Sequence, residues 1–151
     1  MKILICISHV PDTTARIAFV EDNTKYDKSD VQFIISPYEE LALTRALEIK
    51  EKIGDVQISV LNIGLPETEP TLRKALAIGA DDAIRVNAEA TDAMFVAKQI
   101  AEVAKSGDYD LILTGKESID YNGFQVGEMV AEFLDIPSIT SASSLNIEKE
   151  K

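Results

Sequence analysis

Residues 111–134 read LILTGKESIDYNGFQVGEMVAEFL: an apolar run, then a polar turn, then an amphipathic pattern. The run from Leu111 to Thr114 is typical of a strand that is buried in a parallel sheet. It ends abruptly at Gly115, and a helical pattern starts at about Gln125. A strand, a polar loop and a helix in this order form the repeating unit of α/β folds. This segment therefore predicts a parallel sheet at the centre of the protein.

The same alternation runs through the rest of the chain. Apolar runs predict strands at 2–7, 55–64, 81–86 and 109–114, and a further strand is expected to begin at about residue 136. Helical patterns lie at 36–52, 71–80, 91–106 and 125–134, and residues 16–35 predict short extended pieces around a loop. Strands that alternate with helices predict a doubly wound parallel sheet with right-handed crossovers. We therefore expect a single nucleotide-binding α/β domain over 1–151, Rossmann-like, with about five strands.

The first helix has a recognisable start. Pro37 suits the first helical position, and Ser36 with Glu39 three residues later matches a capping box. Gly54 is expected to end this helix, and Gly79 the next one. We place the buried faces of these two helices at the apolar positions Leu43, Ala46, Leu47, Leu72, Ala75 and Leu76.

Composition excludes several classes of function. The net charge of −11 repels phosphate backbones and anionic membranes, so nucleic acid is not an expected partner. The first apolar run is too short for a signal peptide or a membrane span, so we expect a cytoplasmic protein or an organelle form that has already been processed. Cys6 is the only cysteine and His9 the only histidine, so we expect no internal disulfide, no zinc cluster and no serine–histidine pair. Cys6 lies in an apolar run and is expected to be a small core residue.

The polar turn itself has two interpretations. In the first, glycines 115 and 123 allow close backbone approach or positive φ, Lys116 attracts a phosphate, and the helix N-terminus adds free N–H groups. Three neutral donors and one carboxylate accompany them, at Ser118, Asn122, Gln125 and Asp120. In the second, the turn is an ordinary polar loop that ends in a capped helix. The spacing matches neither GxxxxGK[ST] nor GxGxxG, so the residue types alone leave both interpretations open.

Two other loops are expected at the same edge of the sheet. Residues 8–12 follow the first strand, and residues 62–64 follow the second long strand. Ligands of such sheets bind outside the carboxyl ends of strands, so these loops predict one crevice that suits an adenine nucleotide. The carboxylates Asp12, Glu39 and Asp120 are interpreted as caps or solvated charges, and we expect no catalytic residues.

Several long motifs, in order, resemble the electron transfer flavoprotein beta subunit. They are KILICISHVPDT, SPYEELALTRALEIKE, LRKALAIGADDAI and DLILTGKESIDYNGFQVGEMVAEFLDIP. The resemblance covers all 151 residues and corresponds to the N-terminal part of that subunit. It implies a sheet like that of the adenine nucleotide alpha hydrolases. The family's later segment, with a recognition loop for dehydrogenases, has no counterpart in these residues, so either the chain is truncated at its C-terminus or the sequence is one part of a longer chain.

The resemblance also implies ligands and partners. It implies an electron carrier subunit that is not itself an enzyme, holds a structural AMP and pairs with an alpha subunit carrying most of the FAD. Electrons would come from flavin dehydrogenases such as acyl-CoA dehydrogenases. Two alternatives stay open: a bifurcating-type subunit with FAD in the beta site, and a stand-alone nucleotide-binding stress-type protein. The implied nucleotide contacts map onto Cys6, Ser36, Pro37, Tyr38, Glu39, Ile63, Gly115, Lys116, Glu117, Ser118, Ile119, Asp120, Tyr121, Asn122, Gly123, Phe124, Gln125 and Val126.

Overall fold

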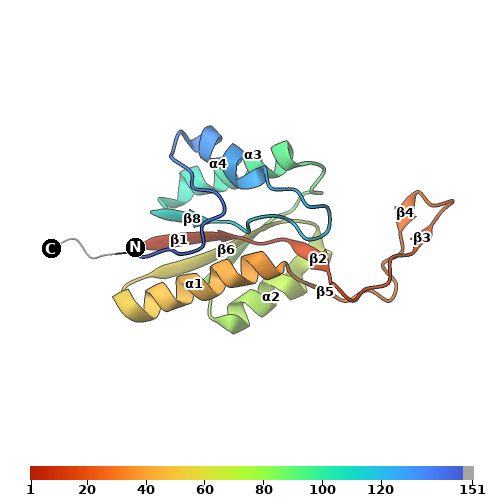
Figure 1. Ribbon diagram of the computed structural model, residues 1–151, viewed down its shortest axis with the longest axis horizontal. Coiled ribbons are helices and arrows are strands. Elements are labelled where there is room, and N and C mark those ends of the chain that lie inside the picture. Colours follow the sequence, from red (N-terminus) through yellow and green to blue (C-terminus); the bar gives the residue numbers. More distant parts are fainter. Residues whose placement is uncertain (148–151) are drawn as a thin grey trace.

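A central parallel sheet carries helices on both faces (Figure 1). The computed structural model describes residues 1–147. Four strands lie in the order β7-β6-β1-β8, and every neighbouring pair is parallel. Their bounds are β1 Lys2–Cys6, β6 Gln57–Ile63, β7 Asp82–Val86 and β8 Leu111–Leu113. The predicted doubly wound α/β fold is therefore confirmed.

Two helices cover each face of the sheet. The helices α1 and α2 lie below it in Figure 1, and α3 and α4 lie above it. Their bounds are α1 Pro37–Ile53, α2 Glu69–Ile78, α3 Ala93–Gly107 and α4 Val126–Leu134, and a short 3-10 helix, η1, spans Pro66–Thr68. None of the helices among the described residues is both long enough and apolar enough to cross a membrane.

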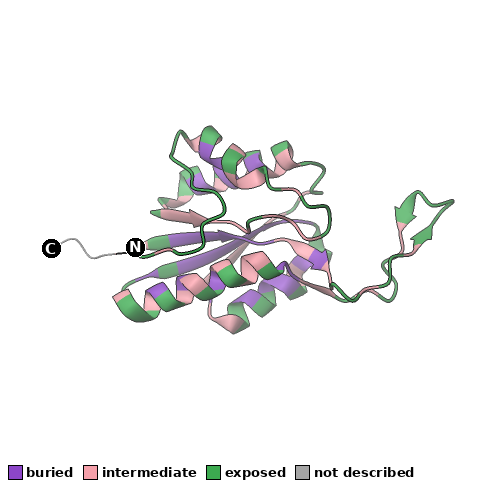
Figure 2. Ribbon diagram, in the orientation of Figure 1, coloured by how far each residue is buried: buried purple, intermediate pink, exposed green. Residues whose placement is uncertain are grey.

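The side chains of β1 alternate between the two layers, because successive residues of a strand point to opposite faces. Ile3, Ile5 and Ile7 pack with α1 and α2, whereas Leu4 and Cys6 pack with α3 and α4. Both faces of the strand are therefore buried, and Figure 2 shows the central strands β1 and β6 as the most buried part of the sheet. This double burial explains why the strand reads as a continuous apolar run.

Some details differ from the expectations. Gly54 and Gly79 do end α1 and α2, with positive φ at both. Leu47 is only half-buried, and Ile49 takes the expected place in the core beside Leu43 and Ala46. In α2, Leu76 is 39 % exposed. Leu47 still packs against the core, as expected, so the predicted face was wrong only at Leu76.

The expected fifth strand is absent from the described part of the chain. Residues 136–147 have no strand, and Ile139 is 88 % exposed. This segment runs from the α3/α4 layer back to α1, where the Nε atom of Arg45 donates to the carbonyl oxygen of Leu145 at 2.9 Å (Figure 1). The apolar residues that begin this segment predict a strand, but neither edge of the sheet pairs with them.

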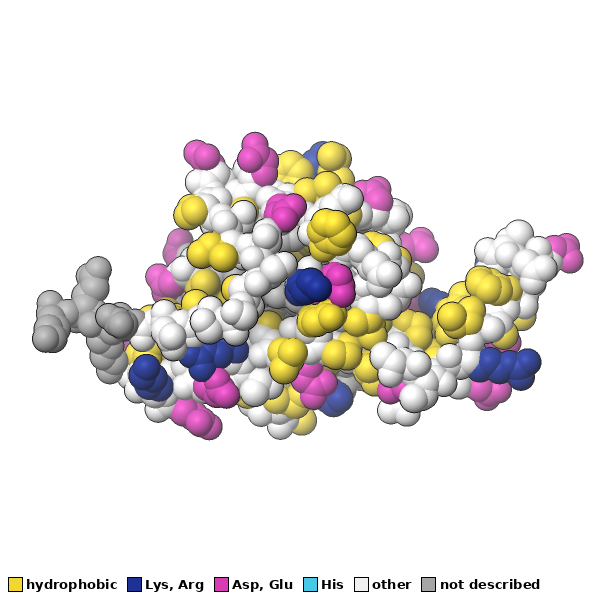
Figure 3. Space-filling model, viewed as in Figure 1, with side chains coloured by type: hydrophobic (Ala, Val, Ile, Leu, Met, Phe, Trp, Pro, Cys, Tyr) yellow, Lys and Arg dark blue, Asp and Glu magenta, His cyan; other side chains and the backbone are white. Residues whose placement is uncertain are grey.

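A thin arm projects from the body between β1 and α1. It contains β2 His9–Pro11, β3 Phe19–Val20, β4 Lys25–Tyr26 and β5 Phe33–Ile35, with β2 antiparallel to β5 and β3 antiparallel to β4. The short extended pieces predicted in 16–35 are therefore confirmed. The hairpin β3–β4 lies far from the sheet in Figure 1. Apolar side chains gather on this arm in Figure 3, and they include the exposed Ile17, Phe19 and Val20.

Candidate functional site

The strand order reverses between β1 and β8. The chain moves from β1 to β6 and β7 on one side, and then returns to place β8 on the other side of β1. Crossover connections diverge at such a point and leave a crevice at the carboxyl ends of the two strands. A cleft opens there, bordered by the ends of β1 and β8, the first turn of α1 and the loop 114–125, and its lining continues along residues 136–146.

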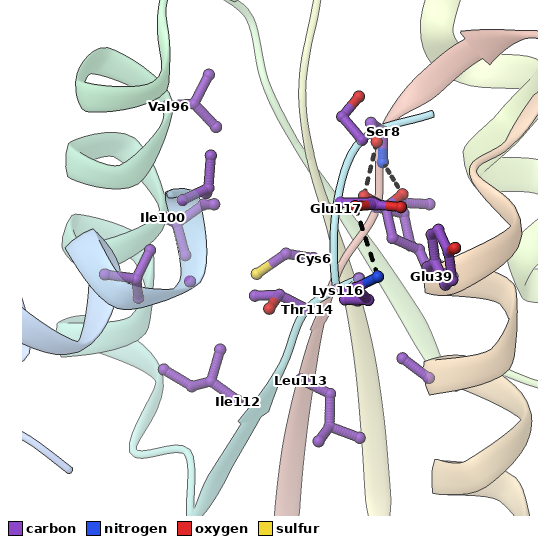
Figure 4. A pocket seen from close by; sticks show the side chains of 18 of the residues that line it. Cys6, Ser8, Glu39, Val96, Ile100, Ile112, Leu113, Thr114, Lys116 and Glu117 are labelled. Carbon is purple, nitrogen blue, oxygen red and sulfur yellow. Dashed lines mark hydrogen bonds and ion pairs between the residues drawn. The ribbon is translucent and has the colours of Figure 1, made fainter. Parts of the chain in front are cut away.

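Glu39 holds the end of β1 against the first turn of α1. Its Oε2 accepts a hydrogen bond from the backbone N–H of Ser8 at 2.5 Å, and its Oε1 accepts from the Ser8 hydroxyl at 2.6 Å (Figure 4). The predicted capping box was therefore wrong, because the carboxylate is taken by Ser8. Ser36 does occupy the N-cap position, but its own side chain makes no capping bond.

The surroundings of Glu39 alter its acidity. Burial raises its pKa from 4.5 to about 7, the two hydrogen bonds from Ser8 oppose this rise, and the negative charge of Asp120 adds to it. The interpretation of Glu39 as a solvated charge or cap was wrong, since the residue lies half-buried in the cleft. A carboxyl group with a perturbed pKa in a cleft is a recognised mark of a functional position.

Lys116 lies at the mouth of the cleft. Its Nζ is 3.6 Å from Glu117 Oε2 and 5.7 Å from the centre of the Tyr38 ring. Figure 4 shows Lys116 and Glu117 on the same side of the cleft as Ser8 and Glu39. The lysine is half-exposed, so its ammonium group can turn toward an anion in the cleft.

The loop between β8 and α4 is folded on itself. The Ser118 N–H donates to the Gly123 carbonyl at 2.8 Å, and the Asn122 N–H donates to the Ser118 carbonyl at 2.9 Å. The Ser118 hydroxyl donates to Asp120 Oδ1, so Asp120 accepts from a hydroxyl and does not pair with Lys116. The loop ends at the N-terminus of α4. The N–H groups of the first turn of α4 have no partners within the helix.

The two glycines of this loop differ in role. A Cβ at Gly115 would lie 2.8 Å from Glu39 Cγ, so close approach is required there. Gly123 does not have positive φ, because among the described glycines only Gly54 and Gly79 do. A Cβ at Gly123 would instead meet the ring of Tyr121 at 2.0 Å. Of the two expected uses of these glycines, close approach is therefore found at Gly115, and positive φ is found at neither.

The opposite wall of the cleft is apolar. It consists of the half-buried Val96 and of Cys6, Ile63 and Ile100, which are buried residues of the core between the sheet and α3/α4. Figure 4 shows Cys6 beside Thr114, with Val96 and Ile100 facing them from α3. Cys6 is buried, as expected, and burial raises the pKa of its thiol well above the usual range. An apolar wall opposite a polar one suits a ligand with a flat apolar part and a charged end.

The structure brings most of the predicted site residues to this cleft. Those that line it are Cys6, Tyr38, Glu39, Ile63, Gly115, Lys116, Glu117, Ser118, Asp120, Tyr121, Gly123, Phe124 and Val126. Five others lie beside it without lining it: Ser36, Pro37, Ile119, Asn122 and Gln125. Ser36 is fully buried under the first turn of α1.

Sequence reasoning did not single out two residues of the site. Ser8 was placed in a converging loop, but its bonds to Glu39 were not foreseen. Thr114 lies where β8 ends, and its Oγ1 would be 2.8 Å from a Cβ at Gly127. Gly127, a small residue in the first turn of α4, is the sequence signal for this close approach between α4 and the end of β8.

Comparison with known proteins agrees with this geometry. The electron transfer flavoprotein domain model matches residues 24–151. The chain belongs to the electron transfer flavoprotein family. The resemblance inferred from the motifs is thereby confirmed, and the matched region includes α1, β8, the polar loop and α4.

Individual relatives point to one subunit of that family. The chain is 36 % identical to the electron transfer flavoprotein subunit beta of Thermoanaerobacterium thermosaccharolyticum, over 100 % of this chain and 58 % of the relative. It is 33 % identical to the human subunit beta, over 100 % of this chain and 61 % of the relative. It is 34 % identical to the acryloyl-CoA reductase electron transfer subunit gamma of Anaerotignum propionicum, over 96 % of this chain and 56 % of the relative. The chain thus spans less than two thirds of the length of these relatives.

Proposed function

We propose that this chain is the nucleotide-binding part of an electron transfer flavoprotein beta subunit and holds AMP in the cleft between β1 and β8. The bound AMP is structural: it fills the crevice and joins the loop 114–125 to the first turn of α1. Electron transfer then belongs to the FAD of a partner alpha subunit. This chain supplies a rigid platform and no catalytic residues of its own.

The observation that carries this proposal is the position of the polar loop. It lies at the reversal of strand order, where nucleotides bind in open α/β sheets, and it ends at a helix N-terminus. The apolar wall from α3 suits the adenine ring, and Lys116 with the first-turn N–H groups of α4 suits the phosphate. The similar proteins named as electron transfer subunits support the same role.

A second ligand is supported by the extent of the cleft. Its lining continues beyond the ends of β1 and β8 along residues 136–146, which suits a ligand longer than AMP. FAD contains the same adenosine phosphate as AMP, with a flavin attached. A bifurcating-type subunit that holds FAD in this cleft is therefore the alternative.

The alpha subunit is the proposed partner, and we propose that the exposed arm is the surface that contacts it. Ile17, Phe19 and Val20 are exposed on the arm, far from the body of the chain. Grouped apolar side chains in water are a mark of protein–protein contact. Flavin dehydrogenases, such as acyl-CoA dehydrogenases, are the proposed electron donors to the assembled pair.

The test is to identify the nucleotide. The purified chain is denatured, and the released small molecules are identified by mass and quantified against protein. Equimolar AMP is the expected result, and equimolar FAD would select the alternative. If no nucleotide is released, AMP and FAD are titrated into the chain by calorimetry, and absence of binding for both would contradict the proposal.

A further inference from the structure

Glu39 occupies the cleft without a cationic partner among residues 1–147. Each of its oxygens accepts a hydrogen bond from Ser8, one from the N–H at 2.5 Å and one from the hydroxyl at 2.6 Å. Lys116, the lysine on that side of the cleft, pairs with Glu117 instead. A half-buried carboxylate with no positive neighbour is costly to ionise.

Lys116 and Glu39 line the same cleft, so an anion bound there lies in a site that both charges share. The Nζ of Lys116 is 5.7 Å from the ring of Tyr38, the residue that precedes Glu39 in α1. On the other side, Gly115 precedes Lys116 and is in van der Waals reach of Glu39. Within a partly desolvated cleft the charges of two such groups are weakly screened, so the charge of Glu39 acts directly on the anion.

The other groups around Glu39 do not neutralise it. From β1, Cys6 presents a thiol that stays protonated, because burial raises its pKa. From the loop 114–125, Asp120 contributes a like charge and Tyr121 a phenol whose pKa is raised by burial and by Asp120. From α1, Glu40 lies 3.7 Å from Lys74 of α2 and does not line the cleft. His9, which follows Ser8, makes its contact with Thr71 of α2 at 2.7 Å.

We propose that Glu39 tunes the affinity of the cleft for the phosphate of an adenine nucleotide through its own charge, so that binding is tighter when Glu39 is protonated. This inference rests on the proposed function. The pKa of Glu39, about 7, places the change in the physiological range of pH. Uncharged adenosine, which has no phosphate to repel, is expected to bind independently of this charge.

The geometry allows the charge to change without opening the structure. In a protonated Glu39, the carbonyl oxygen still accepts from the Ser8 N–H, and the new O–H donates to the Ser8 hydroxyl. The connection between β1 and α1 therefore persists in both states. Glutamine has the same donor and acceptor pattern, so Glu39→Gln represents the uncharged state at every pH.

The experiment measures affinity against pH in protein freed from its nucleotide. AMP and adenosine are titrated by calorimetry at about pH 6 and about pH 8 into the wild type and Glu39→Gln. The phosphate of AMP itself titrates near pH 6, but this effect cancels in the ratio of wild-type to variant affinity. Glu40→Gln is the matched control, because it removes one negative charge from the neighbouring residue outside the cleft.

We expect equal AMP affinities for the wild type and Glu39→Gln at the lower pH, and roughly tenfold weaker binding by the wild type at the higher pH. Adenosine should show no such difference, and Glu40→Gln should follow the wild type. A wild-type to Glu39→Gln ratio that stays constant with pH while AMP binds would overturn this inference and leave the proposed function standing. Failure of all proteins to bind AMP at either pH would overturn both.

Discussion

Gly115 and Glu39 are in direct contact across the cleft. A Cβ atom at residue 115 would lie 2.8 Å from Glu39 Cγ and 3.3 Å from Tyr38 Cβ. The end of β8 can therefore approach the first turn of α1 only because residue 115 has no side chain. This contact brings the polar loop 114–125 and the Glu39–Ser8 connection into one site.

The first prediction follows from this contact. Gly115→Ala should displace Glu39 or the loop, and should lower the free energy of unfolding by about 1–3 kcal/mol, as for other overpacked sites. AMP binding should weaken as well, because the two walls of the cleft separate. Urea unfolding and calorimetry measure the two effects. An alanine variant with wild-type stability and AMP affinity would show that this contact contributes neither to stability nor to AMP binding.

The second prediction concerns stability and pH. Folding raises the pKa of Glu39 from 4.5 to about 7, so between these values the folded protein binds more protons than the unfolded chain. The free energy of unfolding should therefore fall as pH rises through this window, by up to about 3 kcal/mol at about 1.4 kcal/mol per pH unit.

Glu39→Gln should remove that part of the slope, so that the variant gains stability relative to the wild type between about pH 5 and pH 8. Urea unfolding at several pH values measures this gain. Glu40→Gln keeps Glu39 in place and should retain the slope. Parallel curves for the wild type and Glu39→Gln would refute the assignment of a raised pKa to this carboxyl.

The third prediction concerns Lys116. Lys116→Ala should weaken AMP binding about tenfold to a hundredfold, because it removes one charge-assisted contact of about 1.5–3 kcal/mol. The fold should be unchanged, since the lysine is half-exposed and its ion pair lies at the surface. Lys105→Ala is the control, because Lys105 is similarly exposed and pairs with Glu102 within α3. Equal AMP affinity in both variants would make Lys116 an ordinary surface charge.

The fourth prediction concerns the arm. Phe19 is 56 % exposed, so Phe19→Ser should leave the melting temperature of the isolated chain nearly unchanged. If the arm contacts the alpha subunit, the same change should weaken assembly by about tenfold or more, as for an aromatic residue at an interface centre. Binding of purified alpha subunit to immobilised chain measures this. Ile139→Ser, which changes an apolar residue with 88 % exposure outside the arm, is the control.

Comparison of the two variants shows whether the arm contacts the alpha subunit. Loss of assembly in Phe19→Ser alone places the arm at the interface. Loss in Ile139→Ser alone, or in neither variant, would remove the arm from the proposed interface.

Much of the fold was predictable from the sequence alone. The run at 2–7 is apolar at successive positions because both faces of β1 are covered, and the glycines at 54 and 79 end α1 and α2 through positive φ. These signals are local: they depend on period, on turn residues and on chain length. The place of the polar loop at the carboxyl end of β8 follows from the same local order of elements.

Tertiary structure alone decided the chemistry of Glu39 and the end of the sheet. In the sequence, Glu39 stands three residues after Ser36 and matches a cap, but the packing of β1 against α1 gives its carboxylate to Ser8 and buries it. Likewise, the apolar start at residue 136 suits a strand, yet residues 136–147 pair with neither edge of the sheet and instead reach α1, where Arg45 donates to the Leu145 carbonyl. Burial and pairing depend on residues far apart in the chain, so local patterns cannot determine them.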